Sequence, residues 1–188
     1  MRLIAMALLL TSATAFANTE GRSDISYSMA GLEIGFKWAS AELAGSDSNK
    51  QVIGFQIGGS AVFDVAQNFA IKSGLFYNER PFESTYASGT KSTGKITYFD
   101  IPLFVMFKFE ESAGVYLGPS LSIKMANDSS PGGLTNIKGM VVPLTIGGQF
   151  KFAPNMGVNI YFEAVSGELA AGVENSRAVG ANIMMTFD

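Results

Sequence analysis

The clearest pattern in the sequence is an alternation of apolar with small or polar residues between Tyr98 and Met125. From Phe99 every second residue is apolar as far as Phe109, and after residues 110–112 the alternation resumes. A period of two residues predicts extended strands rather than helix. Both strands are longer than the usual strand of a soluble sheet. One bulky face opposite one small, polar or charged face is typical of a membrane-spanning barrel.

The same alternation recurs along the chain and predicts six further strands. Three are expected at about residues 28–39, 51–64 and 137–152, and the other three follow connections at 64–68, 153–155 and 167–175. These strands predict an all-β fold, an eight-stranded antiparallel up-and-down transmembrane β-barrel. No internal repeat, charged tract or linker indicates a second domain, so residues 18–188 are expected to form one outer-membrane barrel domain.

Each predicted strand has a bulky apolar face and a face rich in glycine. We assign the bulky face to lipid, with Phe99, Leu103, Leu117 and Ile160 as test positions. The opposite face would line the lumen, where small residues leave room for long side chains. The predicted inward glycines are Gly31, Gly35, Gly54, Gly58, Gly74, Gly114, Gly118, Gly147, Gly157 and Gly180.

The predicted connections alternate between long and short. Four polar loops are expected at residues 40–50, 82–93, 127–136 and 167–175, whereas the connections at 64–68, 110–112 and 153–155 are short turns. Outer-membrane barrels have long external loops and short periplasmic turns, so both mature termini are expected in the periplasm. Aromatic residues gather at the short-turn ends and would form an interfacial girdle. They are Phe63, Phe69, Phe107, Phe109, Phe150, Phe152 and Phe187, with Trp38, Tyr77 and Phe99 expected at the outer interface.

Residues 1–17 have the features of a cleaved secretory signal peptide. Arg2 supplies the positive charge, Leu3–Leu10 is the apolar segment, and residues 15–17 (Ala-Phe-Ala) form the cleavage site. Cleavage removes 17 of the 188 residues and leaves 171, with 12 basic against 16 acidic side chains. This mild acidity argues against a nucleic acid partner, which calls for concentrated positive charge.

The sequence contains neither cysteine nor histidine. An exported chain without disulfides must be held together by other means, and a closed hydrogen-bonded barrel is one. The absence of histidine removes the commonest catalytic base and metal ligand. We therefore assign no catalytic, cofactor-binding or metal-binding residue and predict that the protein is not an enzyme. Asp100 and Glu163 are conceivable as a carboxylate pair, but a role in ion pairs is the favoured interpretation.

The lumen of an eight-stranded barrel is wide enough only for its own side chains or one small ligand. The predicted inward charges are Glu33, Asp64, Asp100 and Glu163 against Lys37, Lys72, Arg80, Lys108, Lys124 and Lys151. Unpaired buried charge is very costly, so these groups are expected to pair and to plug the lumen. The slight basic excess leaves a second interpretation open, a narrow pore with a weak preference for anions.

Three prolines fall within predicted strands, at Pro102, Pro119 and Pro143. Each removes a hydrogen bond from the strand ladder, and a closed barrel has no free edge on which to place them. We therefore expect bulges or kinks near some of them. A bulge would reverse the assignment of faces beyond it.

Residues 98–103 (YFDIPL), followed by 107–109 (FKF) and 118–120 (GPS), resemble the PorT-like outer-membrane β-barrel family. In that family an aromatic-x-acidic-Ile-Pro-Leu strand precedes a Gly-Pro-Ser strand. The resemblance implies an eight-stranded barrel in a Gram-negative outer membrane, usually without an assigned activity. It also implies insertion by the barrel-assembly machinery, which reads an aromatic residue of the C-terminal strand, here Phe187.

These observations predict a non-enzymatic outer-membrane barrel with a side-chain-filled lumen. Its role would be in envelope structure or in contacts with an unknown extracellular ligand through the four external loops. Two alternatives remain open. One is a soluble periplasmic lipocalin-like carrier of a hydrophobic ligand, which would need the apolar faces turned inward. The other is a narrow porin-like channel.

Overall fold

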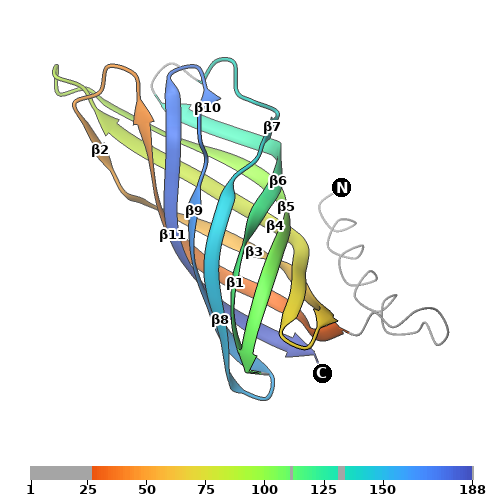
Figure 1. Cartoon of the computed structure of the whole chain (residues 1–188). Coiled ribbons are helices and arrows are strands. Elements are labelled where there is room, and N and C mark those ends of the chain that lie inside the picture. The colour runs from red at the N-terminus through yellow and green to blue at the C-terminus, as the bar shows by residue number, and fades with distance from the viewer. Residues whose placement is uncertain (1–26, 111, 131–133, 188) are drawn as a thin grey trace, which may run out of the picture.

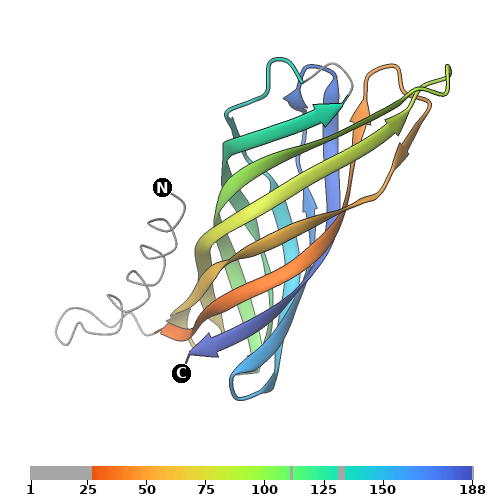
Figure 2. The same ribbon diagram turned by 180° about the vertical axis from the view of Figure 1, so that it is seen from behind.

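The computed structural model describes residues 27–110, 112–130 and 134–187, which form one closed antiparallel sheet (Figures 1 and 2). Its eight long strands are β1 (Tyr27–Leu43), β3 (Val52–Ala66), β4 (Phe69–Thr85), β5 (Lys91–Glu110), β6 (Ala113–Ser130), β8 (Leu144–Ala153), β9 (Met156–Ala164) and β11 (Val173–Phe187). Each pairs with the next long strand, and β1 pairs with β11 to close the barrel. The predicted fold is confirmed, and the predicted signal peptide lies outside the described residues.

Three short strands lie at the end of the barrel that carries the long connections: β2 (Ser48–Lys50), β7 (Met140–Val141) and β10 (Glu168–Ala170). They pair with β4, β6 and β11, respectively. The opposite end carries the tight turns β3–β4, β5–β6 and β8–β9, and the C-terminal end of β11 lies beside them (Figure 1). No helix among the described residues is long and apolar enough to cross a membrane.

The two faces of the sheet agree with the predicted alternation. The side chains of Leu103, Leu117 and Ile160 are 59%, 51% and 57% exposed on the outside of the barrel. Glu33 and Lys72, by contrast, are buried in the lumen. A soluble carrier would require the reverse arrangement, so the structure supports that alternative less than a membrane barrel.

The outward apolar residues form a belt that matches the thickness of a membrane. On β5 it extends from Phe99 to Phe109. The ten steps between these residues, at about 3.3 Å each, cover roughly 33 Å along the strand. A strand tilt of about 40° reduces this to roughly 25 Å along the barrel axis, the height of the apolar band of outer-membrane barrels.

Two inward glycines make room for aromatic rings on the neighbouring strand. A Cβ atom at Gly147 would collide with the ring of Tyr116, and one at Gly180 with the ring of Tyr161. Both pairs are in register across neighbouring strands. The glycine-rich face therefore belongs to the inside, because there it allows large side chains to lie flat against the wall.

Each of the four loops predicted from polar composition contains a connection, but their bounds are wrong, because strands continue into them. The predicted loop at 82–93 is a hairpin in which β4 ends at Thr85 and β5 begins at Lys91. Similarly, β6 continues to Ser130. The strand β10 and the start of β11 occupy most of 167–175, and the end of β1 together with β2 covers much of 40–50. Above the membrane both faces of a strand can be polar, and threonine itself favours strands. Composition alone therefore cannot distinguish such strands from loops.

The three prolines disturb the sheet less than expected. Pro143 lies in a break between β7 and β8, which is the expected irregularity. Pro102 and Pro119 remain in register with Ser120 and Leu144, without a bulge beside them. A register shift in β5–β6 occurs instead between Thr97 and Tyr98. The assignment of faces within the apolar belt is not reversed.

A charge placed on the lipid face should destabilise the barrel. Leu117 lies near the middle of the apolar belt, and Leu117→Arg is expected to lower the free energy of unfolding by about 2–4 kcal/mol, because the guanidinium must enter hydrocarbon. Ser88→Arg, in the exposed β4–β5 turn, is the control and should change it by less than about 0.5 kcal/mol. Urea titration in lipid vesicles, read by the fast gel band of the unboiled folded barrel, measures both. Equal stability of the two variants would contradict the placement of the belt.

Candidate functional site

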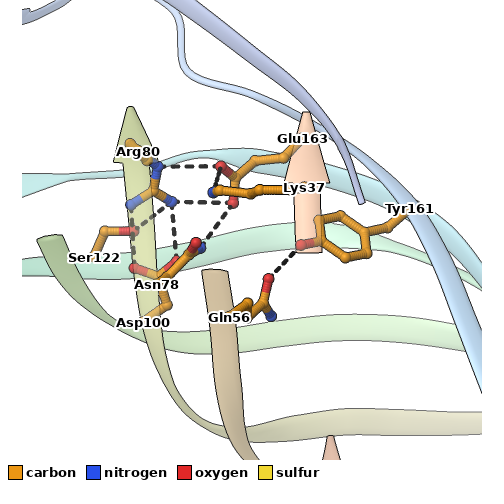
Figure 3. A network of polar contacts seen from close by, with 8 residues as sticks. All are labelled: Lys37, Gln56, Asn78, Arg80, Asp100, Ser122, Tyr161 and Glu163. Atoms are coloured by element: carbon orange, nitrogen blue, oxygen red, sulfur yellow. Dashed lines mark hydrogen bonds and ion pairs between the residues drawn. The ribbon is translucent and has the colours of Figure 1, made fainter. Parts of the chain in front are cut away.

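The most concentrated polar chemistry of the molecule is an ion cluster inside the lumen, centred on Arg80 (Figure 3). The guanidinium donates from Nε and Nη2 to the two oxygens of Glu163, at 3.1 and 3.0 Å, and from Nη2 to Oδ2 of Asp100 at 2.9 Å. Lys37 Nζ also donates to Glu163, at 3.0 Å. Two cations and two carboxylates therefore meet here, and all four side chains are buried.

The cluster is assembled from inward positions of four strands. Lys37 lies on β1, Arg80 on β4, Asp100 on β5 and Glu163 on β9, at positions that the alternation directs into the lumen. A neutral donor and acceptor complete the shell. Asn78 Nδ2 donates to Asp100 at 2.6 Å, and Ser122 Oγ lies 3.3 Å from Arg80 Nη2. The two-point contact of Arg80 with Glu163 fixes both orientation and distance, as is usual for a guanidinium on a carboxylate.

A second cluster lies deeper in the lumen, toward the tight turns. Lys72 Nζ is 2.8 Å from Glu33 Oε1 and donates to Gln149 Oε1 at 2.9 Å. Glu33 also accepts from Ser60 at 2.6 Å and from Asn159 at 2.7 Å. This cluster is also electrically neutral, with one cation and one carboxylate, both buried.

Aromatic rings pack against the deeper cluster. Tyr116 and Phe104 are stacked with ring centroids 4.9 Å apart, and Lys72 Nζ lies 4.9 Å from the Tyr116 centroid. Tyr116 also donates to Asn159 at 2.6 Å. Buried apolar residues complete this layer around the rings; they are Met29, Val62, Ala70, Met106, Tyr161 and Met184. The Lys72 ammonium lies over the face of the Tyr116 ring, and the Tyr116 hydroxyl has Asn159 as its acceptor. The layer is therefore packed without an unpaired charge.

An apolar cap covers the Arg80 cluster at the long-connection end. Its buried residues are Ala41, Phe82, Ile96, Tyr98, Val141, Val165, Leu169, Ala170 and Val173. The Tyr98 ring centroid is 4.9 Å from Arg80 Cζ, so the cap rests directly on the cluster. Two connections are joined across the mouth by backbone hydrogen bonds from Lys138 to Leu169, at 2.9 Å, and from Ala171 to Thr135, at 3.0 Å. Side chains therefore occupy the lumen from the cap to the aromatic layer, apart from a small cavity between the two clusters.

The structure accounts for most of the predicted inward charges. Lys108 pairs with Asp64 near the tight-turn end, and Lys151 also takes part in an interaction. Asp100 and Glu163, which sequence spacing alone did not connect, both contact Arg80 in the ion-pair role that was favoured over catalysis. Among the described residues no group of three or more acidic, histidine or cysteine side chains could hold a metal ion.

Sequence reasoning missed an outward cluster above the apolar belt. Glu79 accepts from Lys95 at 2.7 Å and from the Tyr77 hydroxyl at 3.2 Å. It also accepts from the backbone N–H of Phe55 at 3.3 Å, where β3 and β4 are no longer paired. Glu79 thus satisfies a backbone donor that the ladder leaves free. The nearby Pro81 is the sequence signal for this gap, because proline cannot donate to a neighbouring strand.

Comparison with known families identifies the barrel. A family model described as an outer membrane protein beta-barrel domain matches residues 16–164, well over half of the chain. The chain belongs to this family. As an outer-membrane barrel protein it lies in the outer membrane, and its apolar belt faces the lipid of that membrane. Among curated proteins, no significant match is found.

The solved structures that are similar to this chain include three proteins of low sequence identity. Neisserial surface protein A is 16% identical with a TM-score of 0.54, covering 88% of this chain and 100% of its own. OprG from Pseudomonas aeruginosa is 11% identical with a TM-score of 0.49, covering 87% and 97%. Ail of Yersinia pestis is 14% identical with a TM-score of 0.43, covering 84% and 98%. At these identities the likeness concerns the fold alone, and the first of the three structures supports it.

Removal of the central guanidinium should be costly. Arg80→Met leaves Asp100 without its cation and is expected to lower the free energy of unfolding by about 3–5 kcal/mol, because a buried carboxylate loses its partner. Adding Asp100→Asn should recover part of the loss. Lys50→Met, which removes the cation of the exposed pair with Glu83, is the control and should cost less than about 1 kcal/mol. Urea titration of folded barrels in vesicles gives the comparison; similar losses for Arg80→Met and Lys50→Met would show that the buried cluster does not hold the lumen together.

Proposed function

We propose that this outer-membrane barrel is a non-enzymatic protein with a closed lumen, and that it functions by making contacts with partners at the cell surface. The observation that carries the proposal is the filled lumen, in which the Arg80 cluster lies directly beneath the apolar cap. A barrel filled in this way has no continuous path for solutes. Its accessible chemistry is then limited to the lipid-facing belt and to the part that projects beyond the membrane.

The projecting part is built from strands rather than from loose loops, which suits a binding surface. The hairpin of β4 and β5 and the outer half of β6 continue past the apolar belt, and β2 pairs with the end of β4 (Figure 2). Beneath them the cap supplies a hydrophobic core of its own. A surface held by strand pairing and a core loses little conformational entropy on binding.

The orientation of the barrel in the outer membrane is part of the same proposal. The long connections face outward and the tight turns face the periplasm, with both mature termini, as is the rule for bacterial barrels of this kind. Residues 1–17 serve as the cleaved signal peptide. Phe187, an exposed aromatic residue of β11, is the feature that the barrel-assembly machinery would recognise. Within the family, the motif at 98–103 favours the PorT-like group.

Because the sequence lacks cysteine, single cysteines can report orientation without background. Ser88→Cys in the β4–β5 turn should react with a membrane-impermeant maleimide on intact cells. Gln67→Cys, in the equally exposed β3–β4 turn, should react only after the outer membrane is opened. Gel-shift labelling of both variants provides the measurement. Labelling of Gln67→Cys but not Ser88→Cys on intact cells would invert the orientation.

The contact role is tested by removing the surface while keeping the barrel. A variant in which an Asn-Gly turn replaces residues 84–92 shortens the projecting hairpin but leaves the belt and the Arg80 cluster intact. In a strain that lacks the protein, the full chain should restore attachment of cells to surfaces and to each other, whereas the trimmed variant should not. The unboiled gel band verifies that the variant folds. Full restoration by the trimmed variant would contradict a contact role for this hairpin.

A further inference from the structure

A small cavity lies between the two ion clusters of the lumen. It has a volume of about 30 Å³. Its lining includes Asp100 and Glu163 from the Arg80 cluster and Lys72 and Asn159 from the deeper cluster. The cavity therefore borders both networks.

One residue that lines this cavity carries a buried polar atom that has no partner among the described residues. Asn78 lines the cavity and is 1% exposed, and its Oδ1 atom accepts no hydrogen bond. The amide cannot simply be turned over, because its Nδ2 donates to Asp100 at 2.6 Å and lies 3.5 Å from Glu163. Reversal would place Oδ1 against two carboxylates, which are acceptors only. A buried acceptor without a donor costs free energy, and native interiors rarely contain one.

The charge balance of the lumen argues for a neutral occupant. Arg80 and Lys37 are matched by Asp100 and Glu163, and Lys72 is matched by Glu33. An additional cation or anion would leave one uncompensated charge in a region with little access to water. The occupant must also donate a hydrogen bond to Asn78 Oδ1 and be small.

We propose that the cavity is a binding site for ordered water that joins the two ion clusters into one hydrogen-bonded network. A cavity needs roughly 10–15 Å³ of this volume to hold one water, so a cavity of about 30 Å³ has room for at least one molecule. One donates to Asn78 Oδ1. Ser120 and Thr145 also line the cavity, and their hydroxyls can donate hydrogen bonds to the water or accept them from it.

The consequence is that the polar core of the barrel is continuous. On the cap side, Asn78 connects the water to Asp100 and through it to Arg80. On the tight-turn side, Asn159 lines the cavity and donates to Glu33, which is paired with Lys72. Without water the two clusters are separate, and with it they form a single unit that shares its donors and acceptors.

The test counts long-lived internal water by ¹⁷O magnetic relaxation dispersion on the folded barrel in nanodiscs. Ser120→Val and Thr145→Ile replace the hydroxyls of two cavity-lining residues with larger apolar groups and reduce the space. Each is expected to hold fewer long-lived internal waters than the wild type. Ser176→Val, at a buried position that does not line the cavity, is the control and should lose none. Two lining variants are used so that failure of one to fold leaves the other.

A crystal structure of the wild-type protein provides the second measurement. Water within hydrogen-bond distance of Asn78 Oδ1 is the expected result. An empty cavity, or an equal water count in the lining variants and in Ser176→Val, would overturn the proposal. Crystals grown in rubidium salts address the cation alternative, because an anomalous peak beside Asn78 would show that the site holds a monovalent cation and would also overturn it.

Discussion

A charged side chain inside a narrow barrel can escape neither to water nor to lipid, so it must find an opposite charge across the lumen. That constraint organises the interior of this protein. Arg80 contacts Asp100 and Glu163, and Glu163 in turn contacts Lys37. Because these side chains come from four different strands, the ion pairs also hold opposite walls of the barrel in a fixed relation. A buried pair contributes little net stability compared with apolar packing, but loss of one partner is costly.

The membrane imposes the complementary constraint on the outside. Lipid requires a continuous apolar surface and allows no free sheet edge, and the closed ladder from β1 to β11 meets both requirements. The same strands then continue beyond the belt, where they pack a second core, the cap, over the Arg80 cluster. The extension of the strands beyond the belt thus has two results: it closes the lumen, and it builds an ordered outer surface.

The faces of the strands could be predicted from the sequence, because a two-residue period and the demands of lipid leave only one arrangement. The pairing of charges could not. Asp100 and Glu163 come to the same guanidinium only through the register of several strand pairs, and alternation does not encode that register. Nor could polar composition identify the ends of the strands: the extension of β4 beyond Arg80 contains Phe82, whose burial depends on the cap rather than on the membrane. The role of Glu79 could not be predicted, because its partner is the backbone N–H of Phe55. That N–H lacks a strand partner near Pro81, which follows Glu79 by two residues.

The proposed function depends most on closure of the lumen, and conductance across a planar bilayer measures this closure directly. The folded protein, verified by its fast band on an unboiled gel, is added at increasing amounts at neutral pH and moderate salt. A closed lumen predicts no discrete current steps at any load, because paired charges, stacked rings and the apolar cap occupy the path. Reproducible steps of uniform size from the folded wild-type barrel would contradict it and would identify the protein as a channel.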